Sequence, residues 1–216
     1  MILEGIDISW LGHDCFKIKF NKLIYFDPFQ IKEDEPADII FISHEHFDHC
    51  SKDDLQKISN EHTIIVMIPD AQSKISGIKF GKLILVEPNK KYIVNGLEFE
   101  TIPAYNINKY RSPGIHFHPK QDERVGFIIN INGKRIFHAG DTDFTPEIKN
   151  LKNIDIALIP ISGTYVMTAE EAADAVNSFK PKIAIPMHYG AIVGNEKDAE
   201  RFKELSKVEV VILEKE

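Results

Sequence analysis

Short apolar stretches that alternate with turn residues run through the first 90 positions of this sequence. Residues 6–11 alternate apolar and polar side chains, the pattern of a strand with one buried face. Ser51, followed three positions later by a carboxylate, predicts the start of a helix that ends near Ser59, and Asp70 predicts a short helix through Ile75. Further strands are expected at 15–20, 22–26, 38–42, 63–68 and 83–86.

The second half of the chain repeats this scheme and adds two hairpins. Asn95-Gly96 and Asn132-Gly133 each separate two strand-like runs, and Asn-Gly is a strong signal for a tight hairpin turn. The hairpins join 92–94 to 97–101 and 125–131 to 134–137. Other strands are expected at 154–161, 182–186 and 208–213, with helices beginning at Thr168 and covering 195–205.

This mixture of hairpins and strand–helix units excludes an all-parallel sheet and a pure β-sandwich. The pattern is satisfied by an α/β fold in which two mixed β-sheets pack face to face with helices outside, a four-layer αββα sandwich. The 216 residues are enough for one domain with a substantial core, so we expect a single domain over 1–216. Only 106–124 has the composition of a linker.

Composition narrows the classes of protein that remain. The formal net charge of −7 disfavours a nucleic-acid binder, which needs a basic surface. The chain has two cysteines, Cys15 and Cys50, too few for a disulfide framework, so a reducing, cytoplasmic location is expected. No signal peptide is visible at the N-terminus, and no apolar run is long enough for a membrane span. We therefore expect neither a nucleic-acid partner nor a membrane.

Four metal-ligand side chains lie within six positions, directly after the apolar run 38–42. They are His44, His46, Asp48 and His49. Because side chains alternate along extended chain, His44 and His46 project to the same side. Imidazole and carboxylate together suit zinc, iron or manganese. The spacing therefore predicts an open metal site where a strand ends and a helix begins.

These residues form an H-x-H-x-D-H signature, and with it the chain resembles the metallo-β-lactamase superfamily along nearly its whole length. The motifs that carry the resemblance occur in the expected order: Tyr25-Phe26-Asp27-Pro28, His44 to His49, His138-Ala139-Gly140-Asp141-Thr142 and Pro186-Met187-His188-Tyr189-Gly190. Trp10-Leu11-Gly12-His13 and Pro160 to Tyr165 resemble a narrower branch of small hydrolases, related to L-ascorbate-6-phosphate lactonase and N-acyl-phosphatidylethanolamine phospholipase D. The resemblance implies the metallo-β-lactamase fold, consistent with the αββα sandwich.

The resemblance also implies metal-binding roles for six residues. The first metal ion would be held by His44 and His46, the second by Asp48, His49 and His188, and both would be bridged by Asp141. Two metal ions share a hydroxide and polarise the scissile carbonyl or phosphoryl oxygen when they lie about 3.5–4 Å apart. We expect zinc, as one or two ions, with manganese or iron as alternatives.

Three further residues are expected next to these ligands. By analogy with the family, Asp27 hydrogen-bonds a metal ligand and fixes a histidine tautomer; because Asp-Pro is also a common turn, a turn residue is the alternative. His138 lies three positions before Asp141 and is expected to support the ligands rather than bind metal. His13, at a strand end beside Gly12, is expected near the mouth of the site as a general acid or substrate contact, and a turn histidine is the alternative. Asp48 is expected to be catalytic as well as metal-binding.

The sequence departs from the general superfamily pattern after the strand 97–101. A third histidine for the first metal is expected there, but Asn106 stands in its place, and an amide oxygen is a weak ligand for zinc. His118, or else His116, is predicted to reach the metal as a replacement ligand or a substrate-facing acid. The alternative is a weak first site with the His118 ring in solvent.

Candidate substrate contacts are spread over two loops. Lys109, Arg111, Lys120 and Arg124 gather in 106–124 of an otherwise acidic chain, so they are expected to attract a phosphate or carboxylate substrate. The alternative is a solvated loop. Thr164 and Tyr165 follow a strand end, where their hydroxyls either reach the substrate or serve the loop.

The function favoured by these residues is a metal-dependent hydrolase that uses a metal-bound hydroxide to cleave an ester, lactone or phosphoester in a small soluble substrate. One alternative is an iron-loaded redox member of the fold; another is a metal-binding protein that has lost catalysis. A nuclease is disfavoured by the acidic composition. Neither the substrate nor the oligomeric state follows from the sequence.

Overall fold

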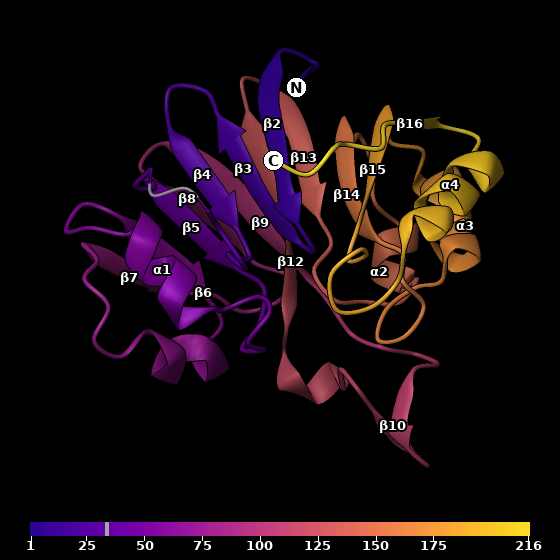
Figure 1. Ribbon diagram of the computed structural model, residues 1–216, viewed down its shortest axis with the longest axis horizontal. Helices are drawn as coiled ribbons and strands as arrows, with labels where there is room; N and C mark the ends of the chain where they lie inside the picture. Colours follow the sequence, from indigo (N-terminus) through magenta and orange to yellow (C-terminus); the bar gives the residue numbers. More distant parts are fainter. Residues whose placement is uncertain (33–34) are drawn as a thin grey trace. The chain divides into compact units, whose positions relative to one another are not determined.

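A computed structural model describes residues 1–32 and 35–216 (Figure 1). The chain divides into two compact units, one formed by Met1–Val86 with Leu213–Glu216, the other by Glu87–Ile212. Each unit contains one large sheet of seven strands. Within the described residues, no helix is both long and apolar enough to cross a membrane.

The sheet of the first unit runs in simple chain order. Its strands are β1 (Ile2–Leu3), β2 (Ile6–Gly12), β3 (Cys15–Lys19), β4 (Leu23–Phe26), β5 (Ile39–Ile42), β6 (Ile64–Met67) and β7 (Lys82–Leu85). The first four pair antiparallel, and β4 to β7 pair parallel, so the sheet is mixed. The helix α1 (Lys52–Ile58) and the 3₁₀ helix η1 (Pro69–Ile75) connect the parallel strands.

The segment from β5 to α1 places the signature residues. All four residues of β5 are buried, as expected of an inner parallel strand. The α1 helix starts where predicted, because the Ser51 hydroxyl accepts a hydrogen bond from the Asp54 backbone N–H at 3.4 Å. The residues from His44 to His49 therefore occupy the turn at the carboxyl end of β5.

The sheet of the second unit has the order β16-β15-β14-β13-β12-β9-β8 and is also mixed. Its strands are β8 (Lys91–Val94), β9 (Leu97–Pro103), β12 (Val125–Ile131), β13 (Lys134–His138), β14 (Ile156–Pro160), β15 (Ile183–Met187) and β16 (Glu209–Val210). Both predicted Asn-Gly hairpins are present: the two turn residues in each have positive φ, 50° and 77° at Asn95-Gly96 and 52° and 79° at Asn132-Gly133.

Helices of the second unit follow the parallel strands. They are α2 (Pro146–Lys149), α3 (Ala169–Phe179) and α4 (Glu196–Leu205), of which α3 and α4 pack on each other beside β14 to β16 (Figure 1). The predicted capping box is formed, because Thr168 and Glu171 exchange side-chain and backbone hydrogen bonds. The buried face of α3 includes Val176 and Phe179, and Phe179 meets Phe137 of β13 edge-to-face at 6.3 Å.

Several predictions of local structure were wrong. Residues 106–124 are not a linker: β10 (Tyr110–Ser112) and β11 (Ile115–His116) pair, and the 3₁₀ helix η2 (Lys120–Asp122) follows. Pro113-Gly114 allows the β10–β11 turn, since proline presets φ and Gly114 adopts φ of 76°. The strand expected at 208–213 is reduced to β16, and the helix expected from Asp70 is a 3₁₀ helix from Pro69. Neither β1 nor α2 was predicted. The prediction of two mixed sheets with helices is confirmed.

Candidate metal sites

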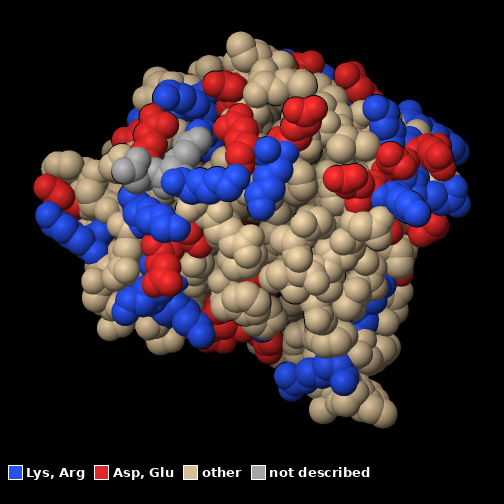
Figure 2. Space-filling view, in the orientation of Figure 1, with Lys and Arg blue, Asp and Glu red and all other residues tan. Residues whose placement is uncertain are grey.

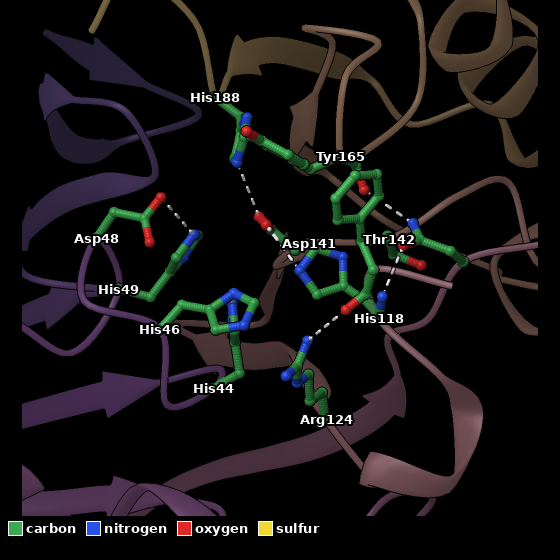
Figure 3. Close-up of polar contacts among 12 residues, drawn as sticks. His44, His46, Asp48, His49, His118, Arg124, Asp141, Thr142, Tyr165 and His188 are labelled. Atoms are coloured by element: carbon green, nitrogen blue, oxygen red, sulfur yellow. Dashed lines mark hydrogen bonds and ion pairs between the residues drawn. The ribbon is translucent and has the colours of Figure 1, made fainter. Parts of the chain in front are cut away.

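The first unit contains a compact ligand set, formed by the residues after β5. His44 and His49 are fully buried, Asp48 is nearly so, and the His46 side chain is 41% exposed. The His44 Nε2 and His46 Nδ1 atoms lie 3.1 Å apart, and the Asp48 Oδ2 and His49 Nε2 atoms lie 3.8 Å apart. Figure 3 shows these four side chains emerging from one turn.

Asp27, at the end of β4, holds two of these rings. Its Oδ2 accepts from His49 Nδ1 at 2.9 Å and from the Ser43 hydroxyl at 2.5 Å, while its Oδ1 accepts from the Ser43 backbone N–H at 2.7 Å. Because the Ser43 hydroxyl proton is given to Asp27, Ser43 Oγ can only accept from His44 Nδ1, at 2.9 Å. Both His44 and His49 therefore carry their proton on Nδ1, which leaves Nε2 as a metal ligand.

His13 lies in the same buried region of the first unit. Its Nε2 donates to Asp48 Oδ2 at 3.0 Å, and its ring is tilted against the His49 ring with centroids 5.4 Å apart. The backbone of His13 has φ of 52° and its carbonyl accepts from Trp10 Nε1 at 2.8 Å. This anchored, left-handed turn directs the ring at Asp48, so His13 is a buried turn residue that contacts a predicted metal ligand, and its catalytic role stays a prediction.

The second unit contains a dispersed ligand set, formed by His118, Asp141 and His188. Asp141 follows β13 and His188 follows β15. His118 follows β11, at the end of the segment that carries the β10–β11 pair. All three side chains are buried. His118 Nε2 lies 3.3 Å from Asp141 Oδ2, and His188 Nε2 lies 3.2 Å from Asp141 Oδ1 (Figure 3). The Ser162 hydroxyl contacts His188 Nδ1 at 2.9 Å and holds that ring. The His118 ring does not point to solvent, which was the alternative outcome for it.

Three pairs of donor atoms, one in the first unit and two in the second, have the spacing of metal ligands. Zinc is bound by nitrogen and oxygen at about 2.0–2.1 Å, so two ligands of a tetrahedral ion lie about 3.3–3.4 Å apart. The separations of 3.3 and 3.2 Å around Asp141, and of 3.1 Å between His44 and His46, are close to this value. Buried imidazole and carboxylate at such distances are the chemistry of a zinc, iron or manganese site.

Asn106 does not offer its amide to a metal. Its Oδ1 accepts from the His118 backbone N–H at 2.8 Å, and its Nδ2 donates to Asp143 and to the Tyr165 carbonyl. Asn106 is thus hydrogen-bonded to the His118 backbone on one side and to Asp143 and Tyr165 on the other. His138 is fully buried, and its Nδ1 accepts from the Gly140 backbone N–H at 3.3 Å, at the turn that presents Asp141.

The predicted substrate contacts have different surroundings. Lys120 donates to Glu147 at 2.8 Å and to the Tyr105 hydroxyl at 3.2 Å; the hydrogen bond to Glu147 raises the pKa of Lys120. Arg124 is buried, and its guanidinium donates to the Phe117 carbonyl at 3.4 Å. Thr164 is exposed, whereas the Tyr165 ring meets Phe117 edge-to-face at 4.8 Å.

Sequence reasoning missed three residues that support the ligands: Ser43, Ser162 and Asp143. A signal existed for Ser43, because it immediately precedes His44 and a hydroxyl there can reach the backbone or ring of its neighbours. No local signal marks Ser162, which meets a histidine 26 positions away.

Comparison with known proteins places the chain in a family. The model of the beta-lactamase superfamily domain matches residues 7–188. The UPF0173 protein of Pyrococcus abyssi is 35% identical over 97% of this chain and 95% of its own length, and the UPF0173 metal-dependent hydrolase of Thermoplasma acidophilum is 32% identical over 94% and 92%. The crystal structure of a proposed metal-dependent hydrolase from Parabacteroides distasonis is 31% identical, with a TM-score of 0.82 over 97% of this chain and 94% of that one.

The chain belongs to the beta-lactamase superfamily and, within it, to the family of the UPF0173 metal-dependent hydrolases. The superfamily resemblance predicted from the motifs is confirmed. The narrower resemblance to a lactonase and a phospholipase branch stays a prediction.

Proposed function

We propose that this protein is a hydrolase of a small ester, lactone or phosphoester, and that the two ligand sets hold its one or two metal ions. The observation that carries the proposal is the hydrogen bonding behind the rings. Asp27 and Ser43 fix the Nδ1 protons of His44 and His49, so Nε2 of each is available as a ligand. Histidines that served only as buried packing residues would not require this common orientation.

A bound divalent ion supplies a water nucleophile near neutral pH and polarises the oxygen of the scissile bond. The residues of the chain position that chemistry. Asp141 is held between two imidazoles, and His13 orients Asp48 through a hydrogen bond of 3.0 Å. His13 is therefore proposed to act through Asp48, as a group that fixes the carboxylate and can pass a proton to it. Zinc is the proposed metal, since the donors are imidazole and carboxylate.

The proposed substrate is small, and an anionic group on it is not required. Lys109 and Lys120 are both paired with glutamates, Glu171 at 2.6 Å and Glu147 at 2.8 Å, which offsets the positive charge that they present. On the face shown in Figure 2, basic and acidic side chains lie next to one another over most of the charged area. This mixture supports a small-molecule substrate rather than a nucleic acid, which favours a continuous basic surface.

The experiment is metal stripping and reloading. Protein treated with a chelator is reloaded with zinc, manganese or iron and assayed on a p-nitrophenyl ester, a lactone and bis-p-nitrophenyl phosphate. We expect turnover of at least one class after reloading, and none by the stripped protein. Metal-loaded protein that is inactive on all three classes would favour lost catalysis, and oxygen consumption by the iron form alone would favour the redox alternative.

A further inference from the structure

The clearest unexplained feature of the second unit is the complete hydrogen bonding of Asn106. Its backbone N–H donates to the His118 carbonyl at 2.8 Å, and its side-chain Oδ1 accepts from the His118 backbone N–H at 2.8 Å. The two residues therefore exchange two hydrogen bonds, with Asn106 as the donor in one and His118 as the donor in the other. They close the base of the excursion that carries β10 and β11, which Figure 1 shows extending away from the strands of the second sheet.

The other end of the Asn106 amide is bonded to the turn after β13. Nδ2 donates to Asp143 Oδ1 at 3.2 Å and to the Tyr165 carbonyl at 2.8 Å. Asp143 in turn accepts from the Ile107 and Asn108 backbone N–H groups, at 2.7 and 3.0 Å, and its own N–H donates to the Tyr105 carbonyl at 2.9 Å. Asp143 is two positions from Asp141, so this network joins the loop of His118 to the turn of Asp141.

The orientation of the amide is determined by its neighbours. If its oxygen and nitrogen were exchanged, the NH₂ group would face the His118 N–H, and the oxygen would face the Asp143 carboxylate. Both contacts would be repulsive. Asn106 is also buried, at 3% exposed. A buried amide with every polar atom satisfied holds one geometry, and the residues bonded to it are held with it.

We propose that Asn106 is a positioning residue that sets the distance between His118 and Asp141. This inference rests on the proposed function, because it assumes that His118 is a metal ligand. A ligand at the end of a long loop can adopt many conformations. Fixing the one conformation in which it binds metal together with the other ligands costs conformational entropy. The two hydrogen bonds to the His118 backbone, and those to Asp143 and Tyr165, remove that freedom and leave His118 Nε2 at 3.3 Å from Asp141.

The test is a double-mutant cycle between Asn106 and His118, with zinc affinity as the readout. Asn106→Ala removes the side-chain bonds, and Asn106→Asp keeps the size and the acceptor for His118 but puts a second carboxylate against Asp143. The matched control is Asn108→Ala in the same loop, which removes the exposed hydrogen bonds of that side chain to Glu171 of α3 and from Lys109. Zinc dissociation constants come from competition with a chelator, cobalt absorption spectra report ligand geometry, and circular dichroism of the metal-free variants checks that they fold.

We expect each Asn106 variant to weaken zinc binding at one site by about 10- to 100-fold, the usual cost of losing a partner that orients a ligand. The same change in a His118→Ala background should cost less than about twofold, because coupled residues do not act additively. Asn108→Ala should leave both zinc affinity and the cobalt spectrum unchanged.

The outcomes separate this inference from the proposed function. If His118→Ala weakens zinc binding but Asn106→Asp does not, Asn106 is not a positioning residue and His118 remains a ligand. If an Asn106 variant weakens binding equally with and without His118, its role is general stability and the inference is wrong. If His118→Ala leaves zinc binding intact, the assignment of His118 as a ligand fails and this inference with it, while the turnover of the metal-reloaded parent protein still decides the proposed function.

Discussion

The two ligand sets of this protein are built in different ways. The first-unit set occupies one turn, from His44 to His49, between a buried strand and a capped helix. The second-unit set is drawn from three separate segments, ending at His118, Asp141 and His188. A short motif limits how far its members can separate, since each residue spans at most about 3.6 Å. The dispersed set has no such limit and depends on strand pairing and on hydrogen bonds between loops.

The supporting residues show the same difference. In the first unit, Asp27 and the adjacent Ser43 orient two rings from a single parallel strand pair, β4 and β5. In the second unit, each histidine has its own support, Ser162 for His188 and Asn106 for His118. A single substitution should therefore disturb several ligands of the compact set, but only one of the dispersed set, unless it removes Asp141.

The largest effect is expected from Asp141→Ala. This carboxylate is the contact shared by His118 and His188, at 3.3 and 3.2 Å, so its removal takes away a ligand and leaves both rings without their common partner. We expect the variant to lose the pair of metal ions and more than about 100-fold of its turnover, beyond the usual cost of losing an orienting residue. Metal content per chain, measured by mass spectrometry after dialysis, provides the check. Two ions retained with unchanged affinity would remove Asp141 from the ligands.

A smaller effect is expected from Asp27→Asn. The amide has only one accepting oxygen, so its NH₂ group must face either the Ser43 backbone N–H or the Ser43 hydroxyl and His49 Nδ1, all of which donate to the carboxylate. The hydrogen bonds that fix the tautomers of two rings of the compact set are thereby weakened. Zinc affinity should fall by about 10- to 100-fold. Asp38→Asn is the control, because Asp38 accepts a hydrogen bond from the Leu23 backbone in the same sheet and touches no predicted ligand. Equal losses from both variants would mean that Asp27 supports the sheet and not the rings.

The smallest effect is expected from Asp54→Asn, which tests the stability of the helix α1 that follows the compact set. The Asp54 carboxylate accepts from the Gln30 and Ile31 backbone N–H groups and from Lys57, at 2.8, 3.0 and 2.8 Å. Burial raises the pKa of Asp54, but the hydrogen bonds from Lys57, Ser51 and those backbone groups outweigh it and lower the pKa. Asp54 therefore stabilises the fold above the unfolded-state pKa of about 3.9, and this contribution disappears as pH falls through the lower folded-state value.

At pH 7 the Asp54→Asn variant should be less stable by about 2 kcal/mol, typical of hydrogen bonds to a charged group. The difference between variant and parent should shrink below about pH 4, where the parent loses the charge. Urea unfolding of metal-free protein at pH 7, 5 and 3.5 measures it. A difference that stays constant over this range would show that the charge of Asp54 contributes nothing to stability.

Much of the fold followed from local patterns. The Asn-Gly pairs at 95–96 and 132–133 are sufficient for hairpins because both turn residues must adopt positive φ, which these residues tolerate. Thr168 with Glu171 marked the start of α3 because the capping box lies within four residues. The β10–β11 pairing was missed because 106–124 is polar, although Pro113-Gly114 marks its turn.

By itself the sequence predicted the compact set of candidate ligands, because its four side chains lie within six positions of one another after a buried strand. It also predicted that a ligand was missing at Asn106 and named His118 as a candidate replacement. Only the tertiary structure decided that the His118 ring is buried beside Asp141, and that Asn106, Asp143 and Ser162 support the dispersed set. These contacts join residues far apart in the chain, and their geometry depends on strand register and loop closure rather than on any local pattern.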